Sequence, residues 1–466
     1  MASAATLALA ISTAFLDGSW TSASMCERAQ RAVRGVRTET RVGAWIRIPH
    51  GAIPARRWLP RLARACLARF PEPPHAELDR LIAFVRARPE LRRHAAGTEV
   101  RVIALPAPRM RTVRGPLADL PLPAITTLEE LAALAHTSVE ALDFLSRPRH
   151  GSRCHPRYAT RWIPKRSGGV RVLEVPSPPL RRLQRTMLDA ILAHVPTHPS
   201  AHGFVRGRSP RSGAVGHVGR EVVVRLDLAD FFASVTAPRV RGVFEALGYP
   251  DLVARRLTAI ATTRLEARAL ARLRALPAAS DDARARRHLL AQRLRAPHLP
   301  QGAPSSPALA NLVAFHLDAR LAGLARQLGA TYTRYADDLT FSGDASLAHR
   351  VEALVSLAAR ICRDEGFALR DDKTRIARRH VRQEVLGVVV NERPNLARDR
   401  YDRLRAVLHR VAREGYERAE LDGTPLGPSA LAGHVAHACT LLGPRRAAKL
   451  RAMWSVVVER EDARSA

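Results

Sequence analysis

The chain has 466 residues, which is enough for two or three compact units or for one large assembly with an extension. Its 75 Lys and Arg residues exceed its 43 Asp and Glu residues and give a formal net charge of +32, which favours a polyanionic partner such as nucleic acid over a membrane surface. Five widely spaced cysteines without a C-x-x-C pair exclude a disulfide framework and a zinc pattern.

Residues 1–103 are rich in Ala, Arg and Leu and carry no motif that indicates a fold, so we interpret them as a basic N-terminal extension of unknown fold. The first residues are apolar, but no basic residue precedes them, and no run in the chain is long enough to span a bilayer. A cytoplasmic protein without a membrane partner is therefore predicted. Residues 104–125 are rich in proline, which predicts a linker.

Between residues 126 and 394 the pattern indicates short strands mixed with helices. Two β-rich runs on either side of Ser167-Gly168-Gly169 predict a hairpin, because glycine is favoured in such turns. Residues 221–228 alternate between two faces and end at Asp227, and a second hairpin is predicted over 331–343 with Asp337 and Asp338 at its turn.

Helical patterns surround these strands. Ser306 is a candidate N-cap with Pro307 as the first helical residue, and apolar residues then recur at helical spacing as far as Gly329. The Arg-rich stretch 264–296 is predicted to be an insertion, in which Asp281-Asp282 is a solvated loop or a helix start. Residues 395–466 are predicted to be helical, with Tyr401, Leu404, Leu408 and Val411 on one face.

Acidic residues at the ends of two strands predict a site for divalent cations. Nucleotidyl transfer needs two such cations roughly 4 Å apart, and magnesium prefers hard oxygen ligands. Asp227 at a strand end and Asp337-Asp338 at a hairpin turn are suitable ligands. Each signal is weak when taken singly, because a lone Asp after an apolar strand is more often a turn or helix-cap residue.

In series, the motifs resemble those of the retron-type bacterial reverse transcriptases. The matched pieces follow the family's order: IPKRSGGVRVLEVPSPPLRRLQ, AHGFVRGRS, VVVRLDLADFF, LPQGAPSSPALANL, RYADDLTFSG, DDKTRI and VLGVVVN. The resemblance covers about residues 126–466. It implies an α+β right-hand polymerase fold behind the N-terminal extension, with fingers and a palm of antiparallel sheet and packed helices over 126–394, and a helical thumb over 395–466.

The resemblance also implies roles for the acidic residues and for an aromatic residue near them. Asp227 and Asp337 would bind two Mg²⁺ ions, with Mn²⁺ as an alternative, and Asp338 would be the second member of the Y-x-D-D pair. Phe232 resembles the gate that excludes a ribose 2′-hydroxyl and so selects deoxynucleotides. The alternative is that Phe232 is a core aromatic beside Phe231.

Further residues resemble those that contact the incoming nucleotide. Gln301 resembles the contacting residue itself, and Gly302 would let the backbone come close. Lys165 and Arg171 resemble the finger residues that clamp the triphosphate. The chain has only three lysines, and Lys373 lies where the family places a functional one, so it is a candidate general acid for the departing pyrophosphate. Chance placement is the alternative.

Two family elements are only partly kept. The family has N-A-x-x-H before the first catalytic Asp, where this chain has Gly213-Ala214-Val215-Gly216-His217, and it has V-T-G where this chain has Val385-Leu386-Gly387. The departures are therefore Gly for Asn and Leu for Thr. His202 and His217 are expected to be structural, because no third partner at metal-ligand spacing accompanies them.

The resemblance implies a defined set of partners. The enzyme would bind a cognate structured non-coding RNA, prime from the 2′-hydroxyl of an internal guanosine, and use deoxynucleoside triphosphates to make a short attached DNA copy. Host ribonuclease H would remove template RNA. Such systems are associated with antiphage defence, often with an effector protein. The extension is a candidate for effector contact or extra RNA binding, and a stabilising appendage is the alternative.

The sequence fits two other classes of protein less well. An intron-encoded reverse transcriptase would be expected to carry a maturase region, for which the stretch after Asn395 is short. A catalytically silent RNA-binding scaffold is disfavoured by the intact Asp227, Asp337, Asp338 and Gln301.

Overall fold

The protein is described by a computed structural model. The described residues are 4–16, 20–35, 55–71, 73–74, 78–94, 98–100, 109–113, 115–146, 157–164, 170–277, 280–417 and 419–465. The chain divides into two compact units: Met1–Val113 with Ala124–Val139 and Glu245–Arg256, and Arg114–Pro123 with Glu140–Phe244 and Leu257–Ala466. This division differs from the predicted one, because residues 126–139 and 245–256 group with the N-terminal residues. The predicted boundaries therefore stay predictions.

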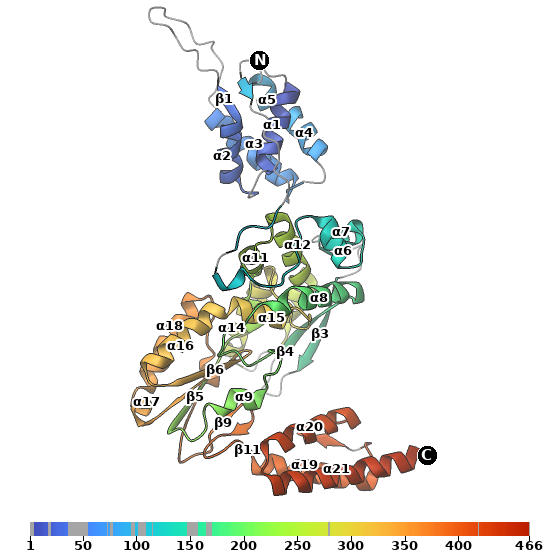
Figure 1. Cartoon of the computed structure of the whole chain (residues 1–466), viewed down its shortest axis with the longest axis vertical. Helices are drawn as coiled ribbons and strands as arrows, with labels where there is room; N and C mark the ends of the chain where they lie inside the picture. Colours follow the sequence, from blue (N-terminus) through green and yellow to red (C-terminus); the bar gives the residue numbers. More distant parts are fainter. Residues whose placement is uncertain are drawn as a thin grey trace, which may run out of the picture. The chain divides into compact units, whose positions relative to one another are not determined.

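The first unit contains a helical body with a core of its own (Figure 1). The elements of this body are α1 (Ala4–Leu16), α2 (Ser22–Ala32), α3 (Ala55–Arg69), α4 (Leu78–Ala87), α5 (Pro89–His94) and the antiparallel pair β1 (Val33–Gly35) and β2 (Thr98–Val100). Helix α6 (Leu128–Leu134) is also grouped with the first unit. Leu7, Ile11 and Phe15 of α1 are fully buried in the same core as Leu59 and Leu62 of α3. The apolar start of the chain is thus a core helix.

The second unit is built around a four-stranded antiparallel sheet with the order β6-β7-β5-β8. Its strands are β5 (Val222–Asp227), β6 (Thr331–Tyr335), β7 (Asp338–Gly343) and β8 (Arg375–Arg378). The predicted 331–343 hairpin is confirmed by the pairing of β6 with β7. Strand β5 lies in the interior of the sheet and is buried on both faces except at the half-buried Arg225, so its predicted alternation does not separate a core face from a solvent face.

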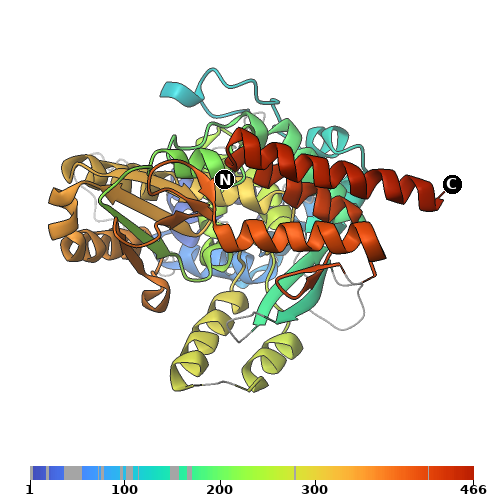
Figure 2. The same cartoon turned by 90° about the horizontal axis from the view of Figure 1, so that it is seen from below.

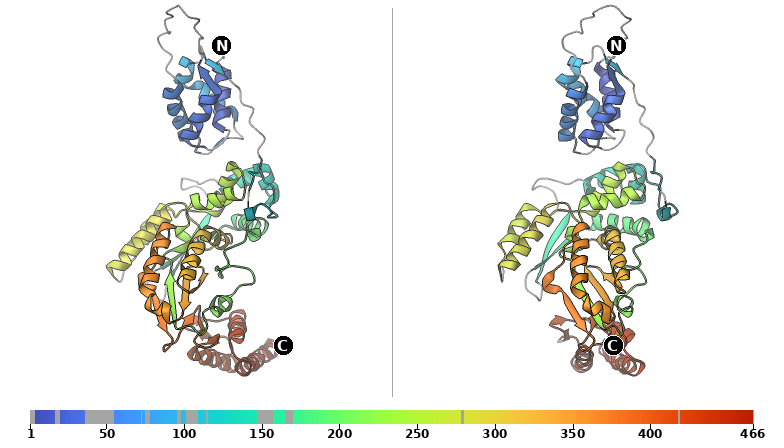
Figure 3. Two further views of the ribbon diagram at one scale, coloured as in Figure 1. Left: turned by 60° about the vertical axis from the view of Figure 1, so that its left-hand side comes forward. Right: turned by 90° about the vertical axis from the view of Figure 1, so that its left-hand side faces the viewer.

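Two helices lie against this sheet, as Figures 1 and 3 show. Helix α16 (Phe315–Gln327) packs on β6, and α18 (Val351–Asp364) packs on α16. The sequence predicts one helix after an N-cap at Ser306, but Ser305 holds the N-cap position and Ser306 is already the first residue of α15 (Ser306–Val313). Helix α15 then meets α16 at 50°, so the predicted helix is two helices. Apolar residues keep helical spacing across the bend, so periodicity alone does not reveal it.

No single helix among the described residues is both long enough and apolar enough to cross a membrane. The bent pair α15 and α16 reaches that length and composition only when the two helices are taken together.

The following helices and turns lie between these elements in the chain. They are α7 (Val139–Ser146), α8 (Pro178–Ala190), α9 (Pro210–Val215), α10 (Phe231–Ser234), α11 (Ala237–Ala246), α12 (Asp251–Ala261), α17 (Ala345–His349) and the 3-10 turns η2 (Gly115–Leu117), η3 (Leu192–His194) and η4 (Asp371–Lys373). The η4 turn directly precedes β8 and brings Lys373 to the end of the sheet.

A second hairpin, outside the four-stranded sheet, packs against the Arg-rich insertion. Strand β3 (Tyr158–Pro164) pairs with β4 (Val170–Pro176), which confirms the first predicted hairpin, although its turn lies outside the described residues. The insertion forms α13 (Ala267–Ala275) and α14 (Asp281–Arg295), which pack on each other (Figure 2) and share a core with Val172 of β4. The Ser280 hydroxyl accepts a hydrogen bond from the Ala283 N–H, so Asp281-Asp282 is a helix start.

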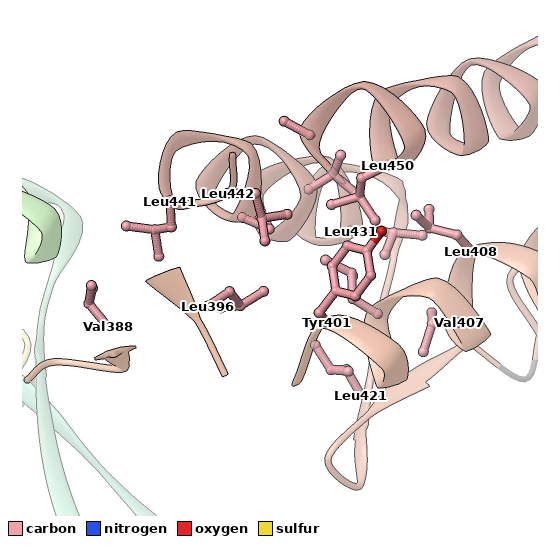
Figure 4. Close-up of a cluster of buried hydrophobic side chains, with 14 of the residues drawn as sticks. Val388, Leu396, Tyr401, Val407, Leu408, Leu421, Leu431, Leu441, Leu442 and Leu450 are labelled. Atoms are coloured by element: carbon pink, nitrogen blue, oxygen red, sulfur yellow. The ribbon is translucent and has the colours of Figure 1, made fainter. Parts of the chain in front are cut away.

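The C-terminal part is helical, as predicted. Its elements are β9 (Glu384–Val385), β10 (Val388–Val389), β11 (Asn395–Leu396), α19 (Arg398–Glu414), β12 (Glu420–Leu421), β13 (Thr424–Pro425), α20 (Pro428–Leu441) and α21 (Pro444–Ser465). The predicted stripe of Tyr401, Leu404, Leu408 and Val411 is buried. Figure 4 shows Tyr401 and Leu408 grouped with Leu431 and Leu450, so α19, α20 and α21 share one core.

Candidate functional site

Three carboxylates from two strands meet at one end of the four-stranded sheet. Asp227 is the last residue of β5 and the register partner of Asp338, the first residue of β7. Asp337 lies in the turn before β7, and its carbonyl accepts a hydrogen bond of 2.9 Å from the Leu228 N–H. The turn itself is tight, because Ala336 adopts a left-handed backbone with φ of +56°. The structure therefore brings the three predicted acids together.

The proximity of these acids is visible in their electrostatics. Burial, followed by the charges of Asp227 and Asp338, raises the pKa of Asp337 from 3.8 to about 6. Burial also raises the pKa of Asp338, although the Arg225 guanidinium, 3.5 Å from the Asp338 carboxylate, opposes that shift. Buried carboxylates that repel one another are stabilised by a cation, and their oxygens are ligands that suit a divalent metal.

Lys373 supplies one positive charge to the site. Its Nζ donates a hydrogen bond of 2.6 Å to Oδ2 of Asp227, whose side chain is 10% exposed. Among the described residues, no three His, Cys, Asp or Glu side chains are arranged as a ready metal centre. Asp227, Asp337 and Asp338 are nevertheless the set that could hold a metal, since a cation there would relieve the repulsion among them.

The two neighbouring phenylalanines after β5 have different surroundings. Phe231 is buried and its ring lies 5.7 Å from that of Phe367. Phe232 is only half-buried, and its ring lies 5.6 Å from Phe231 and 6.1 Å from the exposed Phe204. The core position therefore belongs to Phe231, and Phe232 remains available for the predicted gate.

Three of the residues predicted to contact the nucleotide, Gln301, Gly302 and Arg171, lie at or near strand β4. The Gln301 carbonyl accepts a hydrogen bond from the Glu174 N–H of β4. Gly302 has φ of +132°, and a Cβ atom there would stand 3.0 Å from the Glu174 carbonyl oxygen, so this glycine allows a close approach to β4. Arg171 is exposed on β4. Lys165 lies outside the described residues.

A buried polar network next to the Ala336 turn could not be predicted from the sequence. The guanidinium of Arg334 donates to both carboxylate oxygens of Asp318, at 2.8 and 2.6 Å, and neither side chain is exposed. It also donates to the Ala336 carbonyl at 3.1 Å and to Oδ1 of Asn311 at 2.9 Å. The available signal was an acidic residue, Asp318, inside an otherwise apolar helix stripe.

The two predicted structural histidines do make structural contacts. His217 is fully buried and its ring nitrogens lie 2.7 Å from the Ser342 hydroxyl and 2.8 Å from the Thr333 hydroxyl. Burial lowers the pKa of His217 to about 3, so the ring is neutral at physiological pH. His202 Nδ1 lies 3.0 Å from the Ser212 hydroxyl.

Comparison with known proteins identifies the class and then the family. Residues 163–390 match the family described as "Reverse transcriptase (RNA-dependent DNA polymerase)". The chain is 47% identical over 316 residues to the Retron Mx65 reverse transcriptase of Myxococcus xanthus. The aligned residues cover 66% of this chain and 69% of that protein. The Retron Mx162 reverse transcriptase of the same organism is 38% identical over 285 residues, 57% of this chain and 56% of that protein.

A third relative is the Retron Ec86 reverse transcriptase of Escherichia coli. It is 33% identical over 298 residues, 63% of this chain and 81% of that protein. The chain belongs to the retron reverse transcriptases. It is accordingly an RNA-directed DNA polymerase with mixed helix and sheet content.

Proposed function

We propose that the chain copies part of a cognate structured RNA into short single-stranded DNA by two-metal nucleotidyl transfer. The observation that carries the proposal is the meeting of Asp227 with Asp337 and Asp338 at one sheet end, where burial and then the charges of the other two carboxylates raise the pKa of Asp337. Synthesis would start from the 2′-hydroxyl of an internal guanosine, and the DNA would stay attached to the RNA.

The residues around the carboxylates would divide the remaining tasks. Asp227, Asp337 and Asp338 would hold two Mg²⁺ ions, which supply charge neutralisation at the attacking and leaving oxygens. Phe232 would exclude a 2′-hydroxyl from the nucleotide site. Lys373, whose Nζ already lies at Asp227, would donate a proton to the departing pyrophosphate.

The nucleotide would be held from the side of the β3–β4 hairpin. Gln301 is tied to β4 through its backbone, and Arg171 is exposed on the same strand. With Lys165, these residues would contact the base pair and the triphosphate, and Gly302 keeps their loop close to β4.

The architecture would be that of a right hand. The four-stranded sheet with α16 and α18 corresponds to a palm, the β3–β4 hairpin to fingers, and α19, α20 and α21 to a thumb. The domains would be the predicted 126–394 and 395–466, behind the 1–103 extension and the 104–125 linker.

The biological partners would be those of a retron. They are the cognate RNA and its DNA copy, deoxynucleoside triphosphates, host ribonuclease H for template removal and an effector protein that acts with the DNA in antiphage defence. The net charge of +32 suits a polyanionic RNA partner.

Primer extension on an RNA template, with Mg²⁺ and deoxynucleotides, tests the polymerase site. We expect the wild type to extend primers and the double variant Asp337→Ala/Asp338→Ala to lose synthesis while still binding RNA. Phe232→Ala should admit ribonucleotides. A fully active double variant would refute the metal site, and a wild type that binds RNA but never extends primers would favour an RNA-binding scaffold.

Sequencing of the nucleic acid that co-purifies with the protein tests the retron part separately. We expect one RNA with a short DNA attached at an internal guanosine. Co-purification of RNA without any attached DNA, from cells in which the enzyme extends primers in lysate, would contradict priming from that RNA.

A further inference from the structure

Phe204 combines two unfavourable features beside the carboxylate site. Its side chain is 50% exposed, and its backbone is left-handed with φ of +62°. A bulky residue rarely adopts that strained backbone unless the surroundings enforce it. Strain of this kind, at an exposed aromatic side chain, points to a ligand that the ring contacts.

The ring of Phe204 belongs to an open aromatic cluster. Its centroid lies 6.1 Å from that of Phe232 and 6.4 Å from that of Tyr335, and both of those side chains are half-buried. Phe232 follows Asp227 by five positions, and Tyr335 directly precedes the turn that carries Asp337. The cluster therefore draws one ring from the segment that follows β5 and one from the end of β6, next to the two places in the chain that supply the carboxylates.

The loop that carries Phe204 is fixed to the same turn. A Cβ atom at Gly203 would stand 2.6 Å from the Ala336 nitrogen, so only glycine allows this contact. The buried amide of Asn311 donates a hydrogen bond of 2.9 Å to the Gly203 carbonyl and accepts one from Arg334. The His202 N–H donates to the Arg334 carbonyl at 2.7 Å. These contacts hold the backbone just before Phe204 against the end of β6 and the Ala336 turn.

We propose that Phe204 is a stacking platform for a nucleobase of the base pair that forms at the carboxylate site. This inference rests on the proposed polymerase function. Every nucleobase has an aromatic face, and stacking on an aromatic side chain contributes about 1–3 kcal/mol per base regardless of sequence. Arg206, exposed two residues further along the loop, adds a charge suited to the neighbouring phosphates.

The base belongs either to the incoming nucleotide or to the template RNA, and kinetics separate the two. Loss of the platform for an incoming base raises KM for the deoxynucleotide, whereas loss of the platform for a template base raises Kd for the template–primer. Given the stacking energies above, we expect a rise of roughly 5- to 150-fold in one of these constants.

The test compares Phe204→Ala and Phe204→Leu with Phe204→Trp. Leu keeps apolar bulk without an aromatic face, so Ala and Leu should both show the rise and Trp should remain close to wild type. Phe315→Ala is the matched control, because Phe315 is also exposed but its ring packs against His198 instead of the cluster. Because Phe204 is outside the core, thermal melting should be similar for all variants.

A second readout does not need catalysis. A template–primer with a terminated primer carries 2-aminopurine at the templating position, and its fluorescence is read with and without a deoxynucleotide. Wild type and Phe204→Trp should alter the fluorescence in at least one of these states, and Phe204→Ala and Phe204→Leu should not. Fluorescence and kinetics that are the same in Phe204→Ala as in an active wild type would overturn the platform while leaving the polymerase function intact. A wild type that is inactive but shows the Phe204-dependent signal would count against the polymerase function alone.

Discussion

Gly213 of α9 lies directly against Leu386: a Cβ atom at position 213 would stand 3.0 Å from Cδ1 of the leucine. These are the two positions at which the chain departs from the family's N-A-x-x-H and V-T-G elements. The two departures are therefore neighbours in space, although 173 positions separate them (386 − 213). A larger residue at 213 would need the space that Leu386 occupies, which indicates a matched pair.

Because Gly213 and Leu386 are in contact, we expect that the effects of substituting them on the free energy of unfolding do not add. Gly213→Asn should lower the free energy of unfolding by about 1–3 kcal/mol, because it overpacks the contact with Leu386. Leu386→Thr should also destabilise, since residue 386 has φ of +54° and a β-branched side chain is strained there. The double variant should lose less than the sum of the two single variants, as measured by thermal or urea unfolding.

Gly242→Asn provides the control for this cycle. Gly242 also lies in a helix, α11, and a Cβ atom there would meet nothing within 4 Å. Gly242→Asn should leave the free energy of unfolding nearly unchanged, and its effect should simply add to that of Leu386→Thr. Strict additivity of Gly213→Asn with Leu386→Thr would contradict the pairing.

Lys373 is predicted to compete with a divalent cation for Asp227. In Lys373→Met the carboxylate loses its partner at 2.6 Å, so Mn²⁺ should bind more tightly, by about tenfold or less because the lysine is half-exposed. DNA synthesis should slow by at least about tenfold if Lys373 also acts as the general acid. Calorimetry measures the first effect and primer extension the second.

Lys449→Met is the matched control for Lys373→Met. Lys449 is one of the chain's three lysines and is exposed on α21. Lys449→Met should change neither the affinity for Mn²⁺ nor the rate of DNA synthesis. Unaltered Mn²⁺ affinity in Lys373→Met would show that the ion pair does not oppose metal binding.

The raised pKa of Asp337 predicts a pH dependence of stability in metal-free protein. Its folded pKa, about 6, is above the ordinary value of 3.8, so the folded state binds the proton more tightly than the unfolded state. This contribution is present at low pH and is lost as pH rises from about 4 through 6. The melting temperature of the wild type should therefore fall over this range more than that of Asp337→Asn.

Metal should reverse this trend, since a cation competes with the proton for the same carboxylates. Added Mg²⁺ should raise the melting temperature of the wild type more at pH 7 than at pH 5. Identical pH profiles for wild type and Asp337→Asn would show that another group governs the dependence.

The features that could be predicted from the sequence are those set by local pattern and motif order. The β6–β7 hairpin, the end of β5 at Asp227 and the buried face of α19 all follow from spacing and turn residues. The meeting of the carboxylates could also be predicted, because the order of the motifs resembles that of a family in which the end of one strand and a hairpin turn supply the acids, and Asp227 does pair with Asp338. The catalytic roles of these residues stay predictions.

Features that depend on distant partners could not be predicted. Arg334 in a strand is expected to be exposed, and its burial is made tolerable by the carboxylate of Asp318 on α16 together with hydrogen bonds to Asn311 and Ala336. The left-handed backbone of Phe204 directly follows Gly203, which packs against Ala336 in a contact that no local pattern encodes. The helical body of residues 4–100 has a core but no motif, so its fold emerged only from packing.

The buried pair of Arg334 and Asp318 predicts a large and specific loss of stability. Arg334→Met would leave the Asp318 carboxylate buried with the Tyr332 hydroxyl, at 2.9 Å, as its remaining partner in the network. Breaking one side of a buried pair typically costs about 3–5 kcal/mol.

Arg334→Met/Asp318→Leu should recover part of this loss, because no unpaired charge remains. Thermal or urea unfolding measures both, and Arg320→Met, which breaks an exposed pair with Asp364, should leave stability nearly unchanged. Since Arg334 also holds the Ala336 carbonyl, synthesis by the double variant should stay below wild type even where the protein is folded. Equal unfolding midpoints for Arg334→Met and Arg320→Met would refute the structural role of the pair.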